Sequence, residues 1–280
     1  MITYNHENYI KQAVEGILMQ ICDFHIELII ADDKSSDNTG MIIDEIVKNH
    51  HNGNWIKYTK HSQNLGMMSN FIWALSQTKG NYIALCEGDD YWTDPLKLQK
   101  QVVFLEENPN FTFSMGIVDM YVEKTGKTVV SKEHVNPSKN ETYILRDYLK
   151  APFSQTSSFM FRNGGHPFPD WFQNVHAGDQ SLVVLKTGLH GRIKYHNELF
   201  SVYRVNEKSV SHTVSYNVYV KFLDTLKIWQ SHLGHQYNLI FKIINFKYEQ
   251  YIRLNKCTNI LCKIYYTIKI RIVELVLKFV

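Results

Sequence analysis

The sequence predicts an α/β protein with a doubly wound, mostly parallel sheet, helices on both faces of the sheet, and a C-terminal helical tail. Short apolar runs that end in polar residues alternate with stretches in which apolar residues recur every three or four positions. This alternation of strand and helix is typical of a parallel sheet. At 280 residues, with 44% hydrophobic and 20% charged residues, the chain is long enough for one such domain with an appended segment.

The central strand is expected at Tyr82–Cys86, a nearly unbroken apolar run that suits a position buried on both faces. Asp89 and Asp90 follow this run, and open α/β sheets bind ligands at the carboxyl ends of their strands. Two carboxylates there suit Mg²⁺ or Mn²⁺, which can also hold a diphosphate. The alternative is that both are solvated turn residues ahead of the helix Pro95–Asn108, which Asp94 would cap.

The other elements can be placed in chain order from their apolar spacing. Before the central strand we expect a strand that ends at Asn5, and Asn5 would cap the next helix. The elements that follow are the helix Ile10–Ile21, the strand Glu27–Ala31, a helix carrying Ile42–Val47, the strand Ile56–Tyr58 and the helix Ser69–Lys79. After it we expect the strand Phe111–Ile117, the hairpin Tyr121–Val130, the helix Thr142–Lys150, the strand Ser157–Phe161, the loop Gly164–Gln173, the helix Gln180–Thr187, and the strands Arg192–Tyr195 and Phe200–Arg204.

The loop Asp33–Thr39 carries polar side chains at alternate positions, as a calcium loop does. An EF-hand needs Gly at its sixth position and Glu at its twelfth, where this chain has Asn38 and Asp44. We therefore reject the calcium interpretation and expect contacts to the polar edge of a base or ribose. Simple capping of the next helix by Ser36 or Asp37 is the alternative.

Charge divides the chain into a catalytic domain, expected at residues 1–212, and a basic amphipathic tail, expected at residues 213–280. The tail holds ten Lys and Arg against three Asp and Glu, a net +7, and residues 1–212 hold 20 against 24, a net −4. A nucleic-acid enzyme with a basic cleft is therefore not indicated. No apolar run approaches the roughly 18–20 residues needed to cross a bilayer.

The last part of the tail, Cys257–Val280, repeats apolar residues at helical spacing with Lys and Arg largely on the other side. Such a helix favours peripheral contact with an anionic membrane face. The alternative is that its apolar side packs on the catalytic domain or on a second copy of the chain.

Four cysteines, Cys22, Cys86, Cys257 and Cys262, show no zinc-type spacing, and no signal peptide is visible. We interpret them as reduced thiols of a cytoplasmic protein.

Six short motifs, each weak alone, occur in one order along residues 1–211: Thr3-Tyr4-Asn5, Ala31–Thr39, Asn64-Leu65-Gly66, Glu87–Trp92, Gly178-Asp179, and Tyr203-Arg204 with Ser209-Val210-Ser211. In this order they resemble the inverting family 2 glycosyltransferases, which have the GT-A fold. The resemblance implies metal-dependent transfer of a sugar from a nucleotide donor, with UDP expected, to a hydroxyl of a surface-glycan or lipid-linked acceptor. Two other functions stay open: a nucleotide-sugar-binding protein that has lost catalysis, and a nucleotidyltransferase of similar architecture.

The resemblance also assigns roles to individual residues. The residues that it places around the nucleotide sugar are Thr3, Tyr4, Asp32, Asp33 and Asn64. It places Asp89 against the ribose or sugar, Asp90 on the metal, and Asp179 as the catalytic base. Arg204 is expected beside the diphosphate, and the alternative is that it is only a surface strand residue. A metal can stabilise the leaving diphosphate as a Lewis acid. A carboxylate on the opposite face can take the proton of the attacking hydroxyl, and a single displacement inverts the anomeric centre.

Two features depart from the family pattern. Only Ile2 precedes the first motif, where relatives carry several apolar strand residues, so we expect about 5–6 further residues of strand ahead of Met1. Asn206 stands where the family often has His, and His212 is a candidate substitute or a lone surface residue.

Overall fold

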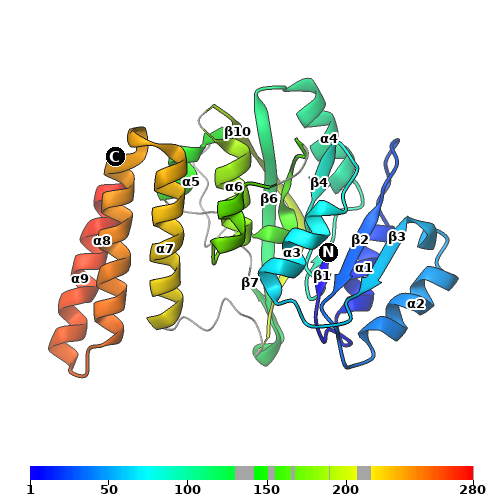
Figure 1. The fold of residues 1–280 in the computed structure, drawn as a ribbon, viewed down its shortest axis with the longest axis horizontal. Helices are drawn as coiled ribbons and strands as arrows, with labels where there is room; N and C mark the ends of the chain where they lie inside the picture. Colours follow the sequence, from blue (N-terminus) through cyan, green and yellow to red (C-terminus); the bar gives the residue numbers. More distant parts are fainter. Residues whose placement is uncertain (130–141, 151–154, 165–167, 189, 207–215, 280) are drawn as a thin grey trace.

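The computed structural model describes residues 1–129, 142–150, 155–164, 168–188, 190–206 and 216–279. A first sheet of three parallel strands lies at one end of the molecule, in the order β1 (Ile2–Thr3), β2 (Leu28–Asp32) and β3 (Ile56–Lys60) (Figure 1). Helices α1 (Ile10–Leu18) and α2 (Thr39–Asn49) connect these strands. The parallel register of β1 and β2 sets Thr3 opposite Asp32, so the loops after the two strands leave the same edge of the sheet.

A second sheet of seven strands occupies the middle of the molecule. Its order is β4 (Tyr82–Ala84), β9 (Met160–Arg162), β6 (Phe111–Val122), β10 (Arg192–Val205) and β5 (Tyr91–Trp92), with β7 (Lys127–Val129) on β6 and β8 (Thr142–Ile144) on β10. Strands β6 and β10 are parallel, and the other pairs of this sheet are antiparallel.

The expected α/β class is confirmed, but the sheets as a whole are mixed. The strand expected at Tyr82–Cys86 is only three residues long and runs antiparallel to β9. Its last two residues have left the strand, although the Leu85 N–H still donates to the Phe159 carbonyl at 3.0 Å. A short apolar run shows that a strand is buried on both faces, and it does not show the direction of its neighbours.

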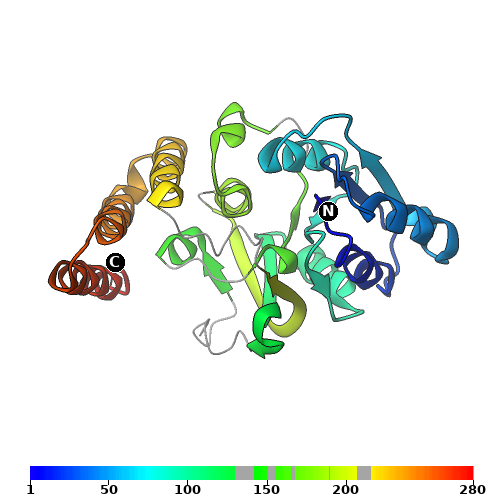
Figure 2. The same cartoon turned by 90° about the horizontal axis from the view of Figure 1, so that it is seen from below.

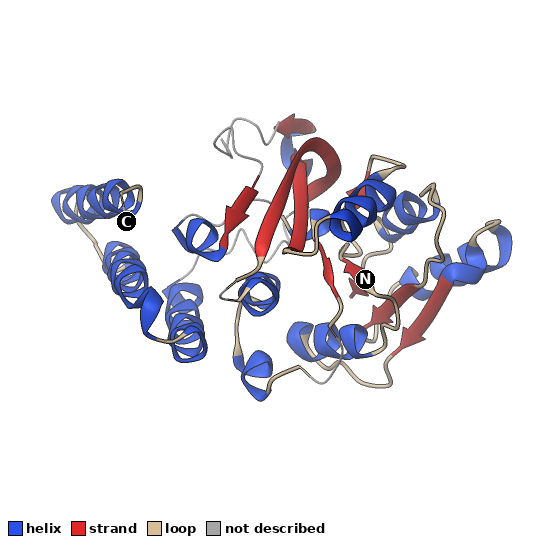
Figure 3. Ribbon diagram, turned by 90° about the horizontal axis from the view of Figure 1, so that it is seen from above, coloured by secondary structure: helices blue, strands red, loops and turns tan. Residues whose placement is uncertain are grey.

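Helices cover both faces of the central strands, as Figure 3 shows from above. These helices are α3 (Met67–Ser76), α4 (Lys97–Glu107), α5 (Leu145–Lys150) and α6 (Gly178–Thr187). Alternate residues of β6 face opposite sides: Phe113 packs in a cluster with residues of α3 and α6, whereas the hydroxyl of Ser114 accepts a bond from Gln101 of α4. This alternation follows the pleat of a strand.

Several expected boundaries were wrong, among them the start of α4, which has Leu96 and not Asp94 at its N-cap position. The segment expected as one helix from Thr142 begins as strand β8, and only Leu145–Lys150 is helical. The two strands expected at Arg192–Tyr195 and Phe200–Arg204 form one long strand, β10, whose register shifts between His196 and Ser201. The segment expected as a strand from Ser157 opens with a 3₁₀ turn, Thr156–Ser158, before β9.

Three long helices, α7 (Tyr216–Leu233), α8 (Asn238–Asn255) and α9 (Ile260–Leu277), lie at the end opposite β1–β3 (Figures 1 and 2). Their first part is joined to the α/β core, because Trp229 of α7 is 2% exposed and donates to the Ser181 hydroxyl of α6 at 2.9 Å. A hydrophobic cluster of buried residues also joins α7 and α8 to Leu145 and Val184. The expected boundary at residues 212 and 213 lies outside the described residues.

The interpretation of all four cysteines as reduced thiols was wrong. A disulfide joins Cys257 and Cys262, while Cys22 and Cys86 are free. The turn from α8 to α9 brings the two Cα atoms to 5.7 Å, a distance that disulfides span, and the five-residue spacing alone did not indicate it. This pair therefore no longer supports a cytoplasmic location.

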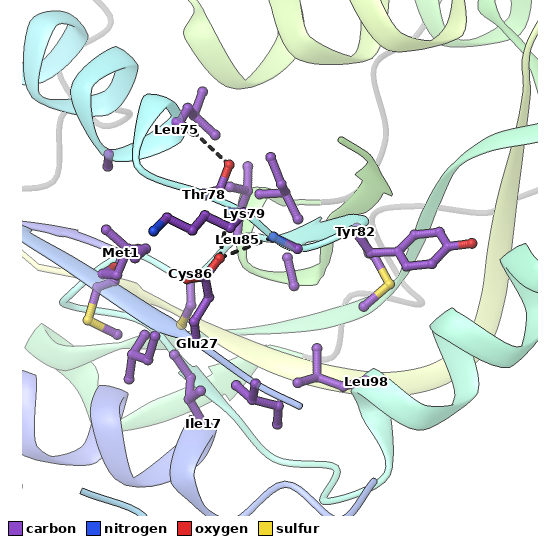
Figure 4. A pocket seen from close by; sticks show the side chains of 18 of the residues that line it. Met1, Ile17, Glu27, Leu75, Thr78, Lys79, Tyr82, Leu85, Cys86 and Leu98 are labelled. Atoms are coloured by element: carbon purple, nitrogen blue, oxygen red, sulfur yellow. Dashed lines mark hydrogen bonds between the residues drawn. The ribbon is translucent and has the colours of Figure 1, made fainter. Parts of the chain in front are cut away.

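A cavity of about 480 Å³ lies beside the short first strand, between β2 and β4. Figure 4 shows Met1, Ile17, Leu85 and Leu98 among the side chains around it. The terminal amine of Met1 donates to the Ile29 carbonyl at 2.8 Å, and β1 pairs with β2 only from Ile2 onward. The sheet therefore leaves an apolar space along the path that continues β1 backward.

Candidate functional site

The loops after β1 and β2 are bonded to each other at the edge where both strands end. Asn5 has a positive φ of 55°, and its side-chain oxygen accepts the Ser36 N–H at 2.8 Å. The Asn5 N–H donates to the Ser35 hydroxyl at 2.9 Å, and the His6 N–H donates to Thr39 at 2.9 Å. Asn5 thus fixes the facing loop and does not cap α1, which begins at Ile10.

Asp32, the last residue of β2, and Asp33, which follows it, accept hydrogen bonds from other groups of the protein. Asp32 is fully buried and accepts the Ser35 N–H at 2.7 Å and the Tyr58 hydroxyl at 2.8 Å. Burial and this bond raise the pKa of Tyr58. Asp33 accepts the N–H groups of Leu65 and Gly66 at 2.6 and 3.0 Å. Both carboxylates therefore position loops around the site.

Asn64, Thr3 and Tyr4 complete this side of the site. Asn64 is exposed and donates to the Asp33 carbonyl at 3.0 Å. Thr3 is 2% exposed, with its hydroxyl 3.2 Å from Nδ1 of His6. Tyr4 is 49% exposed and is open to a planar ligand such as a base.

Gly88 lets the acidic segment approach β1 closely. A Cβ at this position would lie 2.6 Å from Oγ1 of Thr3 and 2.8 Å from Nδ1 of His6. The Gly88 N–H also donates to the Ile2 carbonyl at 3.0 Å. Any side chain here would push Asp89 and Asp90 away from the first sheet.

Four carboxyl groups lie near the contact between Gly88 and β1: those of Glu87, Asp89, Asp90 and Asp179. Asp90 is 2% exposed, and its Oδ1 accepts the Arg204 N–H at 2.9 Å. Burial and the nearby charges of Glu87 and Asp89 raise the pKa of Asp90. Burial, Asp89 and Asp179 raise the pKa of Glu87 to about 8, and Oε2 of Glu87 has no hydrogen-bond partner among the residues that the structure describes. Acidic groups are thus crowded where the two sheets meet, and burial together with their mutual repulsion makes them hold protons more strongly than free carboxyl groups do.

This cluster fits a divalent cation through its donor chemistry. Within the described parts of the chain, no three His, Cys, Asp or Glu side chains are arranged to hold a metal by themselves. Mg²⁺ commonly uses one or two carboxylates and completes its shell with water and phosphate oxygens. Asp90 and Asp89 match that donor set, and a cation beside them would relieve the repulsion that raises the pKa of Asp90 and Glu87.

Asp179 approaches the cluster from the other side, in the first turn of α6. Its Oδ2 accepts the hydroxyl of Thr156 at 3.0 Å, and its charge acts on Glu87. The residue at the N-cap position of this helix is Ala177. The carboxylate of Asp179 is therefore held by the 3₁₀ turn Thr156–Ser158, and it lies close enough to Glu87 to affect the pKa of Glu87.

Arg204 is buried, with 9% of its surface exposed, so it is not a surface strand residue. Its guanidinium donates to Gln12 and lies over the rings of Tyr91, at 4.8 Å, and Tyr9, at 5.3 Å. This aromatic frame holds a cation beside Tyr9, a ring on which the charge of Asp89 also acts. Asn206 is buried nearby in sequence, and His212 lies outside the described residues.

The sequence pattern indicated no individual role for Glu87 or Thr156. Glu87 belongs to the same motif as Asp89 and Asp90, so its position beside them was visible, but its burial was not. Thr156 is 23 residues from Asp179, and only the fold brings the two together.

The chain was compared with protein families and with known proteins. The family model "Glycosyl transferase family 2" matches residues 1–166. "Uncharacterized protein Rv1520" of Mycobacterium tuberculosis is 34% identical over 234 residues, which is 84% of this chain and 63% of that protein. This chain therefore spans less than two thirds of that relative's length. The Escherichia coli protein "UDP-Glc:alpha-D-GlcNAc-diphosphoundecaprenol beta-1,3-glucosyltransferase WfaP" is 35% identical over 129 residues, 43% of this chain and 44% of that protein.

Solved structures share the fold at low sequence identity. Staphylococcus aureus TarS 1–349 in complex with UDP-GlcNAc matches with a TM-score of 0.59 and 17% identity, over 91% of this chain and 69% of that one. The Pyrobaculum calidifontis mannosyltransferase PcManGT in complex with GDP-Man and Mn²⁺ matches with a TM-score of 0.63 and 16% identity, over 90% and 68%. At this identity the likeness concerns the fold.

Proposed function

Because the chain belongs to glycosyl transferase family 2 and has a GT-A-type fold, we propose that it transfers a sugar from a nucleotide-sugar donor to a hydroxyl group with inversion at the anomeric carbon. The observation that carries this proposal is the convergence of Asp89 and Asp90, from the segment after β4, with Asp179, from the first turn of α6, near the edge where β1 and β2 end.

The proposed donor site is the edge formed by the loops after β1 and β2. Tyr4 is exposed there for the base, and Asn64 for polar contacts. Asp32 and Asp33 act through the loops that they hold, since their carboxylates already accept bonds from the chain. UDP is the expected nucleotide, because relatives whose names mention UDP-Glc and UDP-GlcNAc match this chain.

A Mg²⁺ or Mn²⁺ ion held by Asp90, with Asp89 beside it, would supply Lewis-acid stabilisation of the leaving diphosphate. Asp90 is fixed for that role by the Arg204 N–H. The buried guanidinium of Arg204 adds positive charge on the same side of the site. Asp179, aligned by Thr156, accepts the proton of the attacking acceptor hydroxyl.

The proposed acceptor is a surface glycan or a lipid-linked saccharide. Two relatives support this class by their names: the WfaP enzyme, which names a diphosphoundecaprenol acceptor, and the Bacillus subtilis "Minor teichoic acid biosynthesis protein GgaB", which is 28% identical over 222 residues. We propose the cytoplasmic face of the membrane as the place of the reaction, a location that the Cys257–Cys262 disulfide does not support. Within the described residues, none of the helices has the length and apolar character that a bilayer span requires.

A panel of nucleotide sugars tests the proposal. The full chain is titrated with UDP-Glc, UDP-GlcNAc, UDP-Gal and GDP-Man, with Mn²⁺ or with EDTA, and slow release of the free nucleotide is followed. We expect one donor to bind and hydrolyse only with the metal. Binding without hydrolysis or transfer would indicate a protein that has lost catalysis, and no binding of any nucleotide sugar would overturn the proposal.

A further inference from the structure

Helix α9 carries apolar residues on two opposite sides. One side packs in the molecule through Ile270, Val273 and Leu277, each at most 6% exposed. The other side, here called the outer stripe, consists of nine apolar residues that are 43–89% exposed: Ile260, Leu261, Ile264, Tyr265, Ile268, Ile272, Leu275, Val276 and Phe279. The face that is most apolar is thus the one that the described chain leaves in solvent.

The outer stripe is continuous along the whole helix. At 3.6 residues per turn, its nine positions fall within roughly 160° of the helix circumference, opposite the three packed residues. A single exposed Leu or Ile is ordinary on a protein surface, but a contiguous stripe of this length marks a contact surface. The helix is the last one of the fold and lies at its outer end (Figure 2).

Basic side chains border the outer stripe on both edges. Arg271, Lys278 and Lys263 lie along one edge, and Lys269 lies on the other, with its Nζ 4.5 Å from the centre of the Tyr265 ring. The helix has one acidic residue, Glu274, whose carboxylate is 3.1 Å from Arg271 and 3.3 Å from Lys247 of α8. The border is therefore net positive.

The positive border of the outer stripe favours one of the two surfaces that could cover the stripe, a second copy of the chain or a membrane. A second copy of the chain would bring two positive borders together, which costs energy through repulsion. An anionic bilayer offers apolar depth for the stripe and negative headgroups for the border.

We infer that α9 docks the enzyme on an anionic membrane, lying in the plane of the interface with the outer stripe inserted. Contact at this end leaves the β1–β3 end, with the proposed donor site, in the aqueous phase (Figure 1). The inference extends the proposed function and does not depend on it, because no residue of the acidic cluster takes part.

Vesicle co-sedimentation of the full chain tests the inference. Vesicles of phosphatidylcholine alone are compared with vesicles that also contain phosphatidylglycerol, at low and high salt. The first variant combines Leu261→Ser, Ile268→Ser and Ile272→Ser on the outer stripe. Its matched control is Leu239→Ser with Met41→Ser, two equally exposed apolar residues, on α8 and α2.

We expect the unaltered chain and the control to sediment with phosphatidylglycerol vesicles at low salt, and the triple variant to bind at least about 10-fold more weakly. Replacing Lys269 and Lys278 with Gln should weaken binding to anionic vesicles, whereas Lys227→Gln on α7 should not. High salt should reduce the binding of every form.

Two outcomes would overturn the inference. One is that the unaltered chain does not bind phosphatidylglycerol vesicles at low salt, or that the triple variant binds as well as the control. The other is a dimer, seen by sedimentation velocity, that the triple variant abolishes while vesicle binding is absent, which would make the stripe an interface between copies. Circular dichroism and nucleotide-sugar binding, measured in every variant, separate these outcomes from misfolding and from failure of the proposed function.

Discussion

The backbone N–H of Arg204 donates a hydrogen bond to Oδ1 of Asp90 at 2.9 Å, joining the end of the last strand to the acidic segment 114 residues earlier. The hydroxyl of Ser157 also bonds the carboxylate of Asp90, and the bond from Arg204 requires only an acceptor at Oδ1. Asparagine supplies that acceptor without the charge.

Asp90→Asn is therefore expected to keep the fold and lose metal-dependent donor binding. The affinity for UDP in the presence of Mn²⁺, measured by calorimetry, should fall to the value measured with EDTA, while the melting temperature is retained. Asp224→Asn, at an exposed residue of α7, is the matched control and should bind as the unaltered protein does. Undiminished Mn²⁺-dependent affinity in Asp90→Asn would count decisively against a metal at this residue.

Asp179→Asn should retain donor binding and lose transfer. General-base assistance is typically worth about 10²–10⁴-fold, so kcat is expected to fall by that factor while the donor Kd stays within about twofold. Steady-state rates with a polyprenyl-diphosphate sugar acceptor and donor titrations make the comparison.

Thr156→Val is the companion variant, because it removes the bond that aligns Asp179 and leaves the carboxylate in place. Its loss of kcat should be smaller than that of Asp179→Asn. Near-normal transfer by Asp179→Asn would mean that this residue serves only the start of α6.

From the burial of Lys97 we predict that the free energy of unfolding depends on pH. It is fully buried, donates to Gln101 at 2.7 Å and lies 4.1 Å from the centre of the Trp92 ring. Burial lowers the pKa of Lys97 to about 7, whereas an unfolded lysine titrates near 10.4. Between these values the unfolded chain binds one proton more than the folded chain, so this group makes the free energy of unfolding rise with pH.

The rise should be up to about 1.4 kcal/mol per pH unit, and below about pH 7 this group should contribute no slope because both states are charged. Urea unfolding of the unaltered chain and of Lys97→Met at several pH values from 6 to about 9 measures it. The difference in free energy between the two proteins should grow in favour of the unaltered chain above pH 7. Parallel pH curves would show that Lys97 keeps its charge state in both forms.

The cavity beside Met1 predicts that an apolar extension stabilises the fold. Residues added ahead of Met1 can continue β1 between β2 and β4 and fill part of the 480 Å³ space. An extension of about five Val and Ile residues should raise the melting temperature by several degrees, since burying each such side chain contributes about 1.5–3 kcal/mol. A Gly-Ser extension of equal length is the control, and equal melting temperatures for both extensions would contradict the prediction.

Local patterns were enough to predict the order of strands and helices through β4, because the apolar spacing there matches single elements, but they did not indicate the two-residue strand β5. They also led us to propose Asp89, Asp90 and Asp179 as site residues, since carboxylates after strands and before helices are visible in a linear sequence. The fold brings them near Glu87: besides burial, Asp89 and Asp179 raise the pKa of Glu87, and Glu87 and Asp89 raise that of Asp90.

The rest depended on contacts between distant segments. The antiparallel pairing of β4 with β9 depends on a strand that comes more than 70 residues later. Asp32 is occupied by Tyr58, and no local pattern indicates that the hydroxyl reaches it. The disulfide between Cys257 and Cys262 is local, but it depends on the turn from α8 to α9, whose geometry helical periodicity does not encode.

The bond between Trp229 and Ser181 has a consequence for the order in which the protein folds during synthesis. Helices α5 and α6 leave the ribosome well before α7 and α8, so the apolar side that carries Leu145 and Val184 stays uncovered while translation continues. A nascent chain halted in this interval is exposed to aggregation and is a substrate for chaperones. The last part of the core can close only when Trp229 has emerged. Protection of the apolar side of α5 and α6 from aggregation therefore depends on synthesis of α7 and α8.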